Sequence, residues 1–514
     1  MPAWAPLQWP IRTPTFVLDA PAPAHRVDTM KITRFKAPDT TLIIFSIIVL
    51  AAGMTWIVPA GEYQKAEMMV EGAGMREVVV PGSFEMIERP FDGVGDRLVH
   101  TVAIVMQAPI LGFIDPDAAP IIAFVLLVGG AFAVLQKTGA VEASLRRLVH
   151  AADRSRAVEV LTIPLFMALF SLGGAVFGMA EETIPFILIF VPLALALGYD
   201  SITGVAIPFL GSAAGFAGAF LNPFTVGVAQ GIATVPLFSG IGFRVGVWVA
   251  VTALTIAFVM WHASRVRAEP RRSPTFAVDE IKRHEGLHLD TAGPPPALTL
   301  RQNAVLGVFF LGIGILVWGV LQHAWYIIEI AALFVALGIV MGAVGGLGGN
   351  DTAAAFMEGA RDLVSTAIII GLARGILIVM QDGQIIDTIL HALASGLEGA
   401  GSMVAAMSMF GAQTLINFFV PSGSGQAALT MPLMAPLSDL VGVSRQTAVL
   451  AFQMGDGFTN MIIPTSAVLM GSLTLAGVPW QRWARWILPL QAVLFGLGLV
   501  VLAIAVGSGW GVVA

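Results

Sequence analysis

The sequence predicts an all-α polytopic membrane protein with two inverted-topology repeats, each containing a re-entrant helical hairpin and a broken transmembrane helix. Three observations lead to this prediction. Of the 514 residues, 57% are hydrophobic and only 12% are charged, far from the composition of soluble domains. Apolar stretches recur at the length that a bilayer crossing needs. Short polar sequences that would interrupt a helix recur at one fixed offset along the chain.

The composition also excludes several classes of protein. The chain has no cysteine, so it can form neither a disulfide framework nor a thiolate metal site. The formal net charge of -6 is too small to suggest a polyanionic partner, and no nucleic-acid binding is expected. Residues 1–29 are rich in proline and lack a long apolar core, so we expect a disordered extension, with the natural chain starting at Met30.

Uninterrupted apolar windows predict membrane spans at about 40–59, 118–137, 240–262, 301–322, 325–345, 363–381 and 486–508. Two further windows, 201–235 and 444–476, contain Gly, Asn, Pro and Asp and are predicted to be broken helices. Segments 157–197 and 402–440 are predicted to enter the membrane and return on the same side. The stretch 60–117 is predicted to be an outer loop with an amphipathic piece. The result is nine crossings.

Basic residues assign one side of these spans to the cytoplasm. Lysine and arginine gather before the first span, after the second, in the 263–300 linker and before the last span. The positive-inside bias therefore predicts a multi-pass protein with a cytoplasmic N-terminus. The predicted domains are a first transmembrane repeat at 30–262, the cytoplasmic linker, and a second repeat at 301–514 that includes one extra span.

The two halves share residues at an offset of 244 positions. The recurring pairs include Pro192 and Pro436, Gly198 and Gly442, Thr203 and Thr447, and Gly211 and Gly455. With the extra span between the halves, the first hairpin enters from the cytoplasm and the second from outside, as in many secondary transporters. A single Gly-Ser patch is equally well explained by close helix packing. Four interruptions in matched positions instead predict a binding site, because broken helices persist in hydrocarbon only where protein or water satisfies their backbone.

Several motifs in these segments are specific. They read FGMAEETIPF at 177–186, LNPFTVGVAQ at 221–230, VPSGSGQAALTMPLMAPL at 420–437 and QMGDGFTNMIIPTS at 453–466. Together with residues 35–63 they resemble the YfcC-like membrane carriers. That family groups with C4-dicarboxylate carriers and arginine/ornithine antiporters in the wider ion-transporter superfamily. The resemblance covers about residues 30–510 and implies an inner-membrane secondary carrier, a homodimer with an elevator-like movement. It leaves the substrate open.

Polar residues at the hairpin tips and in the broken helices are the candidate substrate-binding residues. Glu181 and Glu182 at the first tip are suited to a substrate ammonium, Na⁺ or a proton, while helix capping is the alternative for one of them. The second tip offers only neutral donors, which suit a carboxylate. An acidic end and a neutral end together favour an amino acid. The predicted residues are Glu181, Glu182, Thr183, Asn222, Thr225, Asn417, Ser422, Gly423, Ser424, Gly425, Gln426, Thr465 and Ser466.

Asp456 is expected to interrupt the second broken helix. Its carboxylate and the polar residues around it predict a cation site. With Thr459 and Asn460 it offers carboxylate, hydroxyl and amide oxygens, which suit a hard cation such as Na⁺. The alternative is a helix-breaking turn with Asp456 as N-cap. Na⁺ or H⁺ is the expected coupling ion, and no other cofactor is expected. Arg374, alone in the 363–381 span, is expected to bind a substrate carboxylate or to pair with a tip glutamate.

These patterns predict an ion-coupled symporter or antiporter of a small carboxylate metabolite, with a zwitterionic or basic amino acid favoured. The alternative is a C4-dicarboxylate exchanger, disfavoured because the tip glutamates repel a dianion unless they are protonated or paired. A passive channel suits paired inverted hairpins less well. A remote alternative is a membrane zinc protease, because His284–His288 fits the H-E-x-x-H pattern. The motif lies in a charged linker and has no third ligand, so no enzymatic activity is expected.

Overall fold

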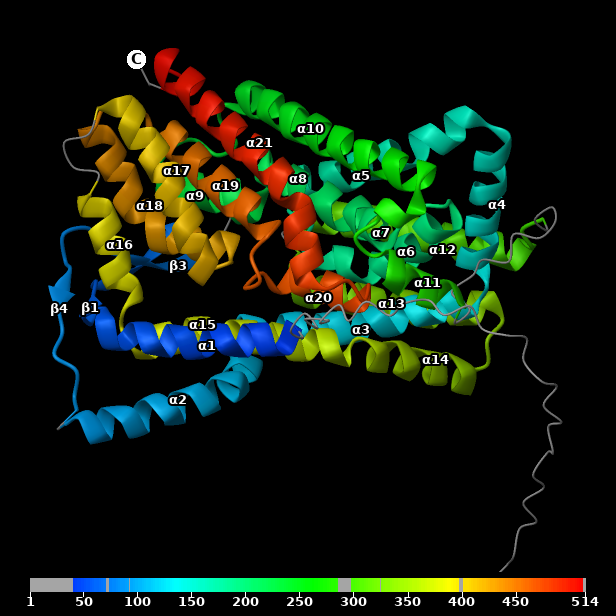
Figure 1. Ribbon diagram of the computed structural model, residues 1–514, viewed down its shortest axis with the longest axis horizontal. Helices are drawn as coiled ribbons and strands as arrows, with labels where there is room; N and C mark the ends of the chain where they lie inside the picture. The colour runs from blue at the N-terminus through cyan, green and yellow to red at the C-terminus, as the bar shows by residue number, and fades with distance from the viewer. Residues whose placement is uncertain are drawn as a thin grey trace, which may run out of the picture. The chain divides into compact units, whose positions relative to one another are not determined.

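The computed structural model describes residues 40–70, 74–91, 93–284, 297–323, 325–396 and 401–511. These residues are mostly helical, which confirms the predicted all-α polytopic fold class. Among the described residues, ten helices are long and apolar enough to cross a membrane. Figure 1 shows how they are arranged. They are α1 (Thr40–Ile57), α2 (Val94–Ile114), α3 (Ala118–Lys137), α5 (Arg156–Phe177), α10 (Ile241–Ala268), α12 (Leu300–His323), α13 (Ile327–Gly345), α15 (Val364–Asp382), α17 (Ser402–Phe419) and α21 (Trp480–Gly507).

Shorter elements connect these helices or form the broken ones. The helical segments are α4 (Ala140–Arg154), η1 (Glu181–Phe186), α6 (Ile187–Ala196), α7 (Ser201–Val205), η2 (Ala206–Leu210), α8 (Gly211–Ala217), η3 (Pro223–Gly227), α9 (Val228–Ile232), η4 (Pro270–Arg272), α11 (Phe276–His284), α14 (Gly349–Asp362), α16 (Ile386–Ser395), α18 (Gly423–Leu440), α19 (Arg445–Asn460) and α20 (Ala467–Leu475). The strands are β1 (Gly61–Glu62), β2 (Lys65–Val70), β3 (Gly74–Val79) and β4 (Glu85–Met86). Strand β1 pairs antiparallel with β4, and β2 pairs antiparallel with β3.

The stretch between α1 and α3 differs from the predicted outer loop. It contains the four short strands and α2, an apolar helix of spanning length that packs against α15. The strands are fastened to α16. The Tyr63 backbone N–H donates to Asp387 Oδ2 at 3.1 Å, and the Tyr63 hydroxyl lies 3.0 Å from His391 Nδ1. Phe84 stacks on the His391 ring with 4.0 Å between centroids.

Each half contains a helical hairpin where the sequence predicts one. In the first, α5 ends at Phe177, its C-cap Gly178 adopts a left-handed φ of 75°, and the chain returns through η1 and α6. In the second, α17 ends at Phe419 and α18 begins at Gly423, with Ser422 as its N-cap. Pro421 lies between these helices and, having no backbone N–H, does not continue α17. The inverted-topology relation between the two hairpins stays a prediction.

Each half also contains a broken helix. The first runs through α7, η2 and α8, loses helical structure over residues 218–222, and resumes with η3 and α9. The second ends α19 at Asn460 and resumes with α20 at Ala467. Helix α10 continues to Ala268, so the linker begins later than position 263. The linker helix α11 is docked by Lys282, whose Nζ donates to Ser201 Oγ at 2.6 Å and to the Ala476 carbonyl at 2.5 Å.

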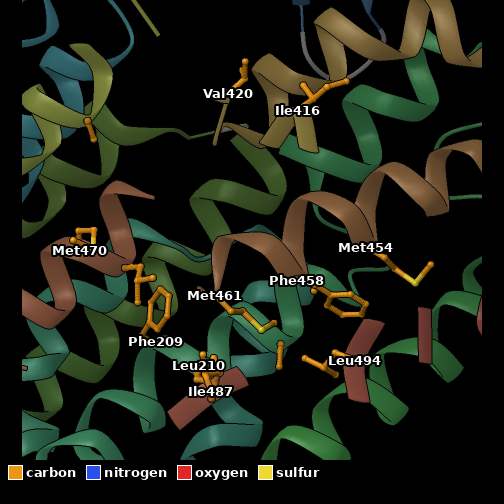
Figure 2. Close-up of a cluster of buried hydrophobic side chains, with 14 of the residues drawn as sticks. Phe209, Leu210, Ile416, Val420, Met454, Phe458, Met461, Met470, Ile487 and Leu494 are labelled. Atoms are coloured by element: carbon orange, nitrogen blue, oxygen red, sulfur yellow. The ribbon is translucent and has the colours of Figure 1, made fainter. Parts of the chain in front are cut away.

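A large apolar core surrounds α19, the helix that contains Asp456. Figure 2 shows Met454 and Phe458 of α19 among side chains from neighbouring elements. Close crossings at glycine bring the helices together: a Cβ added to Gly457 would lie 2.5 Å from Ala217 Cβ on α8. Helix α19 is therefore buried on all sides, and the polar residues near its end are held inside protein. The proline-rich extension 1–29 and the His284–His288 motif beyond its first residue lie outside the described residues.

Candidate functional site

Both hairpin tips converge on the first broken helix. A Cβ added to Gly178 at the first tip would lie 2.6 Å from Asn222 Oδ1. A Cβ added to Gly423 at the second tip would overlap the Thr225 methyl group and lie 3.7 Å from Asp456 Oδ2. The second broken helix contributes to both tips, because α20 packs against η1 and Asp456 on α19 lies near Gly423. Residues from positions far apart in the sequence therefore meet in one place.

The first tip presents the two adjacent acids. The Glu182 side chain is buried, and its Oε2 accepts a hydrogen bond from the Ala180 N–H at 2.9 Å. The buried Thr183 hydroxyl donates to the Ala180 carbonyl at 2.6 Å, so it holds the turn in shape. Glu182 thus satisfies one N–H of the tip, as a capping residue does. Two neighbouring carboxylates in a poorly hydrated place cannot both stay ionised cheaply without a cation.

The second tip presents a helix N-terminus. Ser422 Oγ accepts from the Gly425 N–H at 3.3 Å, and the backbone of Gly423 and Ser424 forms the first turn of α18. A helix start of this kind favours an anionic group. The expected donor Gln426 is engaged elsewhere. Its Nε2 donates to the Gln413 carbonyl at 2.9 Å and to Gln413 Oε1 at 2.7 Å, which ties the two hairpin arms together.

The broken helices contribute buried polar atoms without partners. Asn222 Oδ1 caps the following turn, accepting from the N–H groups of Phe224 at 2.9 Å and Thr225 at 3.3 Å. Among the described residues, Asn222 Nδ2, Thr225 Oγ1 and Thr465 Oγ1 have no hydrogen-bond partner. Ser466 instead caps α20, accepting from the Leu469 N–H at 3.5 Å. Buried polar atoms without partners are costly, so this arrangement suits a polar ligand.

Asp456 lies inside α19, four residues before its end, so the prediction that it interrupts the helix or caps the next one is wrong. Its Oδ1 accepts from Asn460 Nδ2 at 3.1 Å, and Asn417 Nδ2 donates to its carbonyl at 3.1 Å. Within the described parts of the chain, Asp456 Oδ2 and Asn460 Oδ1 have no partner. A fully buried carboxylate near the negative C-terminal end of a helix favours a cation beside it. Thr459 Oγ1 donates to the Gly455 carbonyl at 2.5 Å.

The ligand set around Asp456 suits a hard cation such as Na⁺ more than a transition metal. Asp456, Asn460 and Thr225 offer oxygen atoms. The described residues contain no group of three or more His, Cys, Asp or Glu side chains that could hold a metal ion.

Arg374 pairs with two aspartates that belong to neither tip. Its Nε is 2.8 Å from Asp115 Oδ1 and its Nη2 is 2.6 Å from Asp117 Oδ2, in the turn between α2 and α3. The expected pairing with a tip glutamate is therefore wrong, and the guanidinium charge is compensated without a substrate carboxylate. The structure also reveals polar residues that the sequence did not single out. Gln453 on α19 donates to the Phe216 carbonyl at 2.5 Å, beside the first break.

Comparison with known proteins identifies the family. A sequence profile of the C4-dicarboxylate anaerobic carriers (DcuC) matches residues 37–507. The chain belongs to this family. The resemblance to YfcC-like carriers is confirmed as well. The chain is 40% identical over 492 residues to "Putative basic amino acid antiporter YfcC" of Escherichia coli (strain K12), covering 91% of this chain and 96% of that protein. As a member of this family, the chain is a multi-pass membrane transporter.

One further protein and two solved structures are similar to this chain. An uncharacterised Haemophilus influenzae protein is 29% identical over 501 residues, which is 92% of this chain and 97% of that one. The Alcanivorax borkumensis YdaH transporter structure has 17% identity and a TM-score of 0.44, covering 92% of this chain and 99% of that one. The Neisseria gonorrhoeae MtrF structure has 19% identity and a TM-score of 0.40, with coverage of 92% and 96%.

Proposed function

We propose that this transporter is an ion-coupled carrier of a small carboxylate metabolite, with a zwitterionic or basic amino acid as its substrate. The observation that carries the proposal is the cluster of buried, unpartnered polar atoms of Asn222, Thr225 and Asp456 where the hairpin tips meet. Donors for a carboxylate and oxygens for a cation lie side by side there. The 40% identical Escherichia coli protein, "Putative basic amino acid antiporter YfcC", is described with the same substrate class.

Each end of the cluster has a role in the proposal. The N-terminus of α18 and Asn222 Nδ2 bind the substrate carboxylate, while Glu181 and Glu182 bind its amine. Asp456 and Asn460 bind the coupling ion, either Na⁺ or a proton shared at the carboxylate. Because Asp456 lies next to Gly423, an ion bound there links α19 to the second hairpin. The carrier works as a homodimer in the inner membrane.

A C4-dicarboxylate is the second candidate substrate. The family description names this class of substrate, and the second tip has only neutral donors. Two carboxylates at the first tip oppose a dianion unless a proton or cation joins them. The two candidates therefore predict opposite responses when one tip glutamate is neutralised.

Binding to purified protein separates the candidates. L-Arginine and succinate are titrated with and without Na⁺ and at several pH values, using Glu182→Gln, Asp456→Asn and the control Asp382→Asn. Asp382 faces His100 at 2.7 Å, away from the tips. We expect Glu182→Gln to weaken arginine binding about tenfold or more, the scale of a charge-assisted hydrogen bond. Asp456→Asn should remove the Na⁺ or pH dependence. If Glu182→Gln strengthens succinate binding, the substrate is a dicarboxylate rather than an amino acid. Unchanged ligand binding in both Glu182→Gln and Asp456→Asn would refute the proposed site.

A further inference from the structure

A second buried polar cluster lies at the N-terminus of α19. It joins Arg244 on α10, Gln230 on α9 and Gln446 in the first turn of α19. Arg244 Nη2 and Gln230 Nε2 both donate to Gln446 Oε1, each at 3.1 Å. Gln446 lies ten residues before Asp456 on the same helix. At 1.5 Å per residue, about 15 Å of helix therefore separates this cluster from the candidate cation site.

The guanidinium of Arg244 is buried without a counter-ion. The side chain is 0% exposed. In the part of the chain that the structure describes, its Nε and Nη1 have no hydrogen-bond partner, and no carboxylate forms an ion pair with it. The Trp510 ring lies over it, 5.6 Å from Cζ. An unpaired charge inside protein costs several kcal/mol, so this arginine favours an anionic partner.

The helix next to Arg244 favours an anion for a separate reason. Helix α19 has 16 residues, and Ser444 Oγ caps the Thr447 N–H at 3.1 Å. The other N–H groups of the first turn have no carbonyl partner within the helix, and this end of the helix dipole is positive. A cationic side chain at the positive end of a helix is the reverse of the usual preference. An anion between them would satisfy both groups.

No carboxylate among the described residues supplies that anion. Asp439, near the end of α18, pairs with Arg445 in the first turn of α19, whose Nη2 lies 2.8 Å from Asp439 Oδ2. Arg445 also donates to the Ala233 carbonyl at 2.9 Å. The charges of Arg244, Arg445 and Asp439 therefore sum to one positive charge. Gln230 holds the surrounding loop in place, because its Oε1 accepts from the Phe238 N–H at 2.5 Å.

We propose that Arg244 and the first turn of α19 form a binding site for a small monovalent anion, either a halide or a short carboxylate such as formate. The anion is proposed to be small because Arg244, Gln230 and Gln446 are all buried. The proposal is independent of the substrate site. It concerns an anion that stabilises the transporter and neutralises Arg244.

Thermal unfolding of the purified protein tests this site. Chloride, bromide or formate replaces gluconate, a much larger anion, at constant ionic strength. We expect a saturable rise in Tm of about 2 °C or more for the wild type, since a ligand that binds only the folded state stabilises it. The halide and formate arms show which anion the site prefers. Crystals grown in bromide should show anomalous density beside Arg244.

Two variants and one control decide the role of Arg244. Arg244→Gln should lose the anion response. Gln446→Glu places a carboxylate beside the guanidinium, so it should raise Tm in gluconate and remove the response to small anions. The control Arg482→Gln alters an arginine that donates to the Pro274 carbonyl at 2.9 Å, and it should respond like the wild type.

Equal Tm values for the wild type in gluconate, halide and formate would overturn the proposal. So would an anion response that persists in Gln446→Glu. The second variant keeps every buried donor of Arg244, so the test stands even if Arg244→Gln does not fold.

Discussion

Replacing Gly423 with alanine should obstruct the contact between the second hairpin tip and the first broken helix. The added Cβ would overlap the Thr225 methyl group and lie 3.4 Å from Phe216 Cζ. The backbone of Gly423 has no positive φ, so alanine introduces no strain of its own and the effect is steric. Overpacking of this kind costs about 1–3 kcal/mol. If the displaced tip binds the substrate carboxylate, affinity should fall about 10- to 100-fold.

The assay is L-arginine binding to the purified variant, with thermal unfolding measured on the same sample. Gly411→Ala is the matched control, because Gly411 lies inside the neighbouring arm α17 and an added Cβ meets nothing within 4 Å. Alanine in an open helical position should raise stability by about 0.5–1 kcal/mol and leave the affinity unchanged.

Thr225→Ser provides the rescue. Serine removes the methyl group that the new Cβ overlaps but keeps the hydroxyl, so Gly423→Ala combined with Thr225→Ser should recover much of the lost affinity. The reasoning would be refuted by wild-type arginine affinity in a folded Gly423→Ala protein. Equal losses with and without Thr225→Ser would show that the cause is not this contact.

Two further predictions concern residues outside the hairpins. Arg374→Gln should lower Tm while leaving substrate affinity unchanged, because its guanidinium holds Asp115 and Asp117 between α2 and α3; reduced affinity at unchanged Tm would contradict this. Burial, followed by the nearby Asp387 charge, raises the pKa of Tyr63 to about 12. The folded state therefore favours the neutral phenol, and the stability it contributes is present below pH ~10 and is lost as pH rises through about 12. Phenolate absorbance should show one of the three tyrosines titrating near pH 12, and this step should be missing in Tyr63→Phe; its persistence in that variant would assign it to another tyrosine.

The strongly apolar helices are predicted well from the sequence. Helix α2, which has charged residues in its first turns, is not predicted as a helix of spanning length. Helix α3 ends at Lys137, where its apolar window ends, because hydropathy alone determines such a span. Asp96, Arg97 and His100 occupy the first turns of α2, so its uninterrupted apolar sequence is too short to predict a membrane span. Its packing against α15 depends on residues far away in the sequence, which a local window does not include.

The candidate site could be predicted in its parts but not in its contacts. The repeated polar interruptions predict that the hairpin tips and the broken helices come together. No feature of the local sequence, however, shows that Gly423 lies against Thr225. Asp456 was expected to break a helix because glycines flank it, but burial of α19 on all sides keeps the helix intact to Asn460. Gln426 faces Gln413 rather than the tip, a choice between hydrogen-bond partners that depends on the packed hairpin arms.

The contacts between the halves also bear on how the transporter is synthesised. Thr225 and Gly423 touch although they are about 200 positions apart in the sequence. When the first half has been inserted into the bilayer, Thr225 and Asn222 do not yet have the second hairpin beside them. Before the second half follows, η3 lacks the packing that α18 and α19 provide, and lipid offers no hydrogen bonds to its polar groups. Under the proposed function, substrate and coupling ion would stabilise only the finished chain, and never its first half alone.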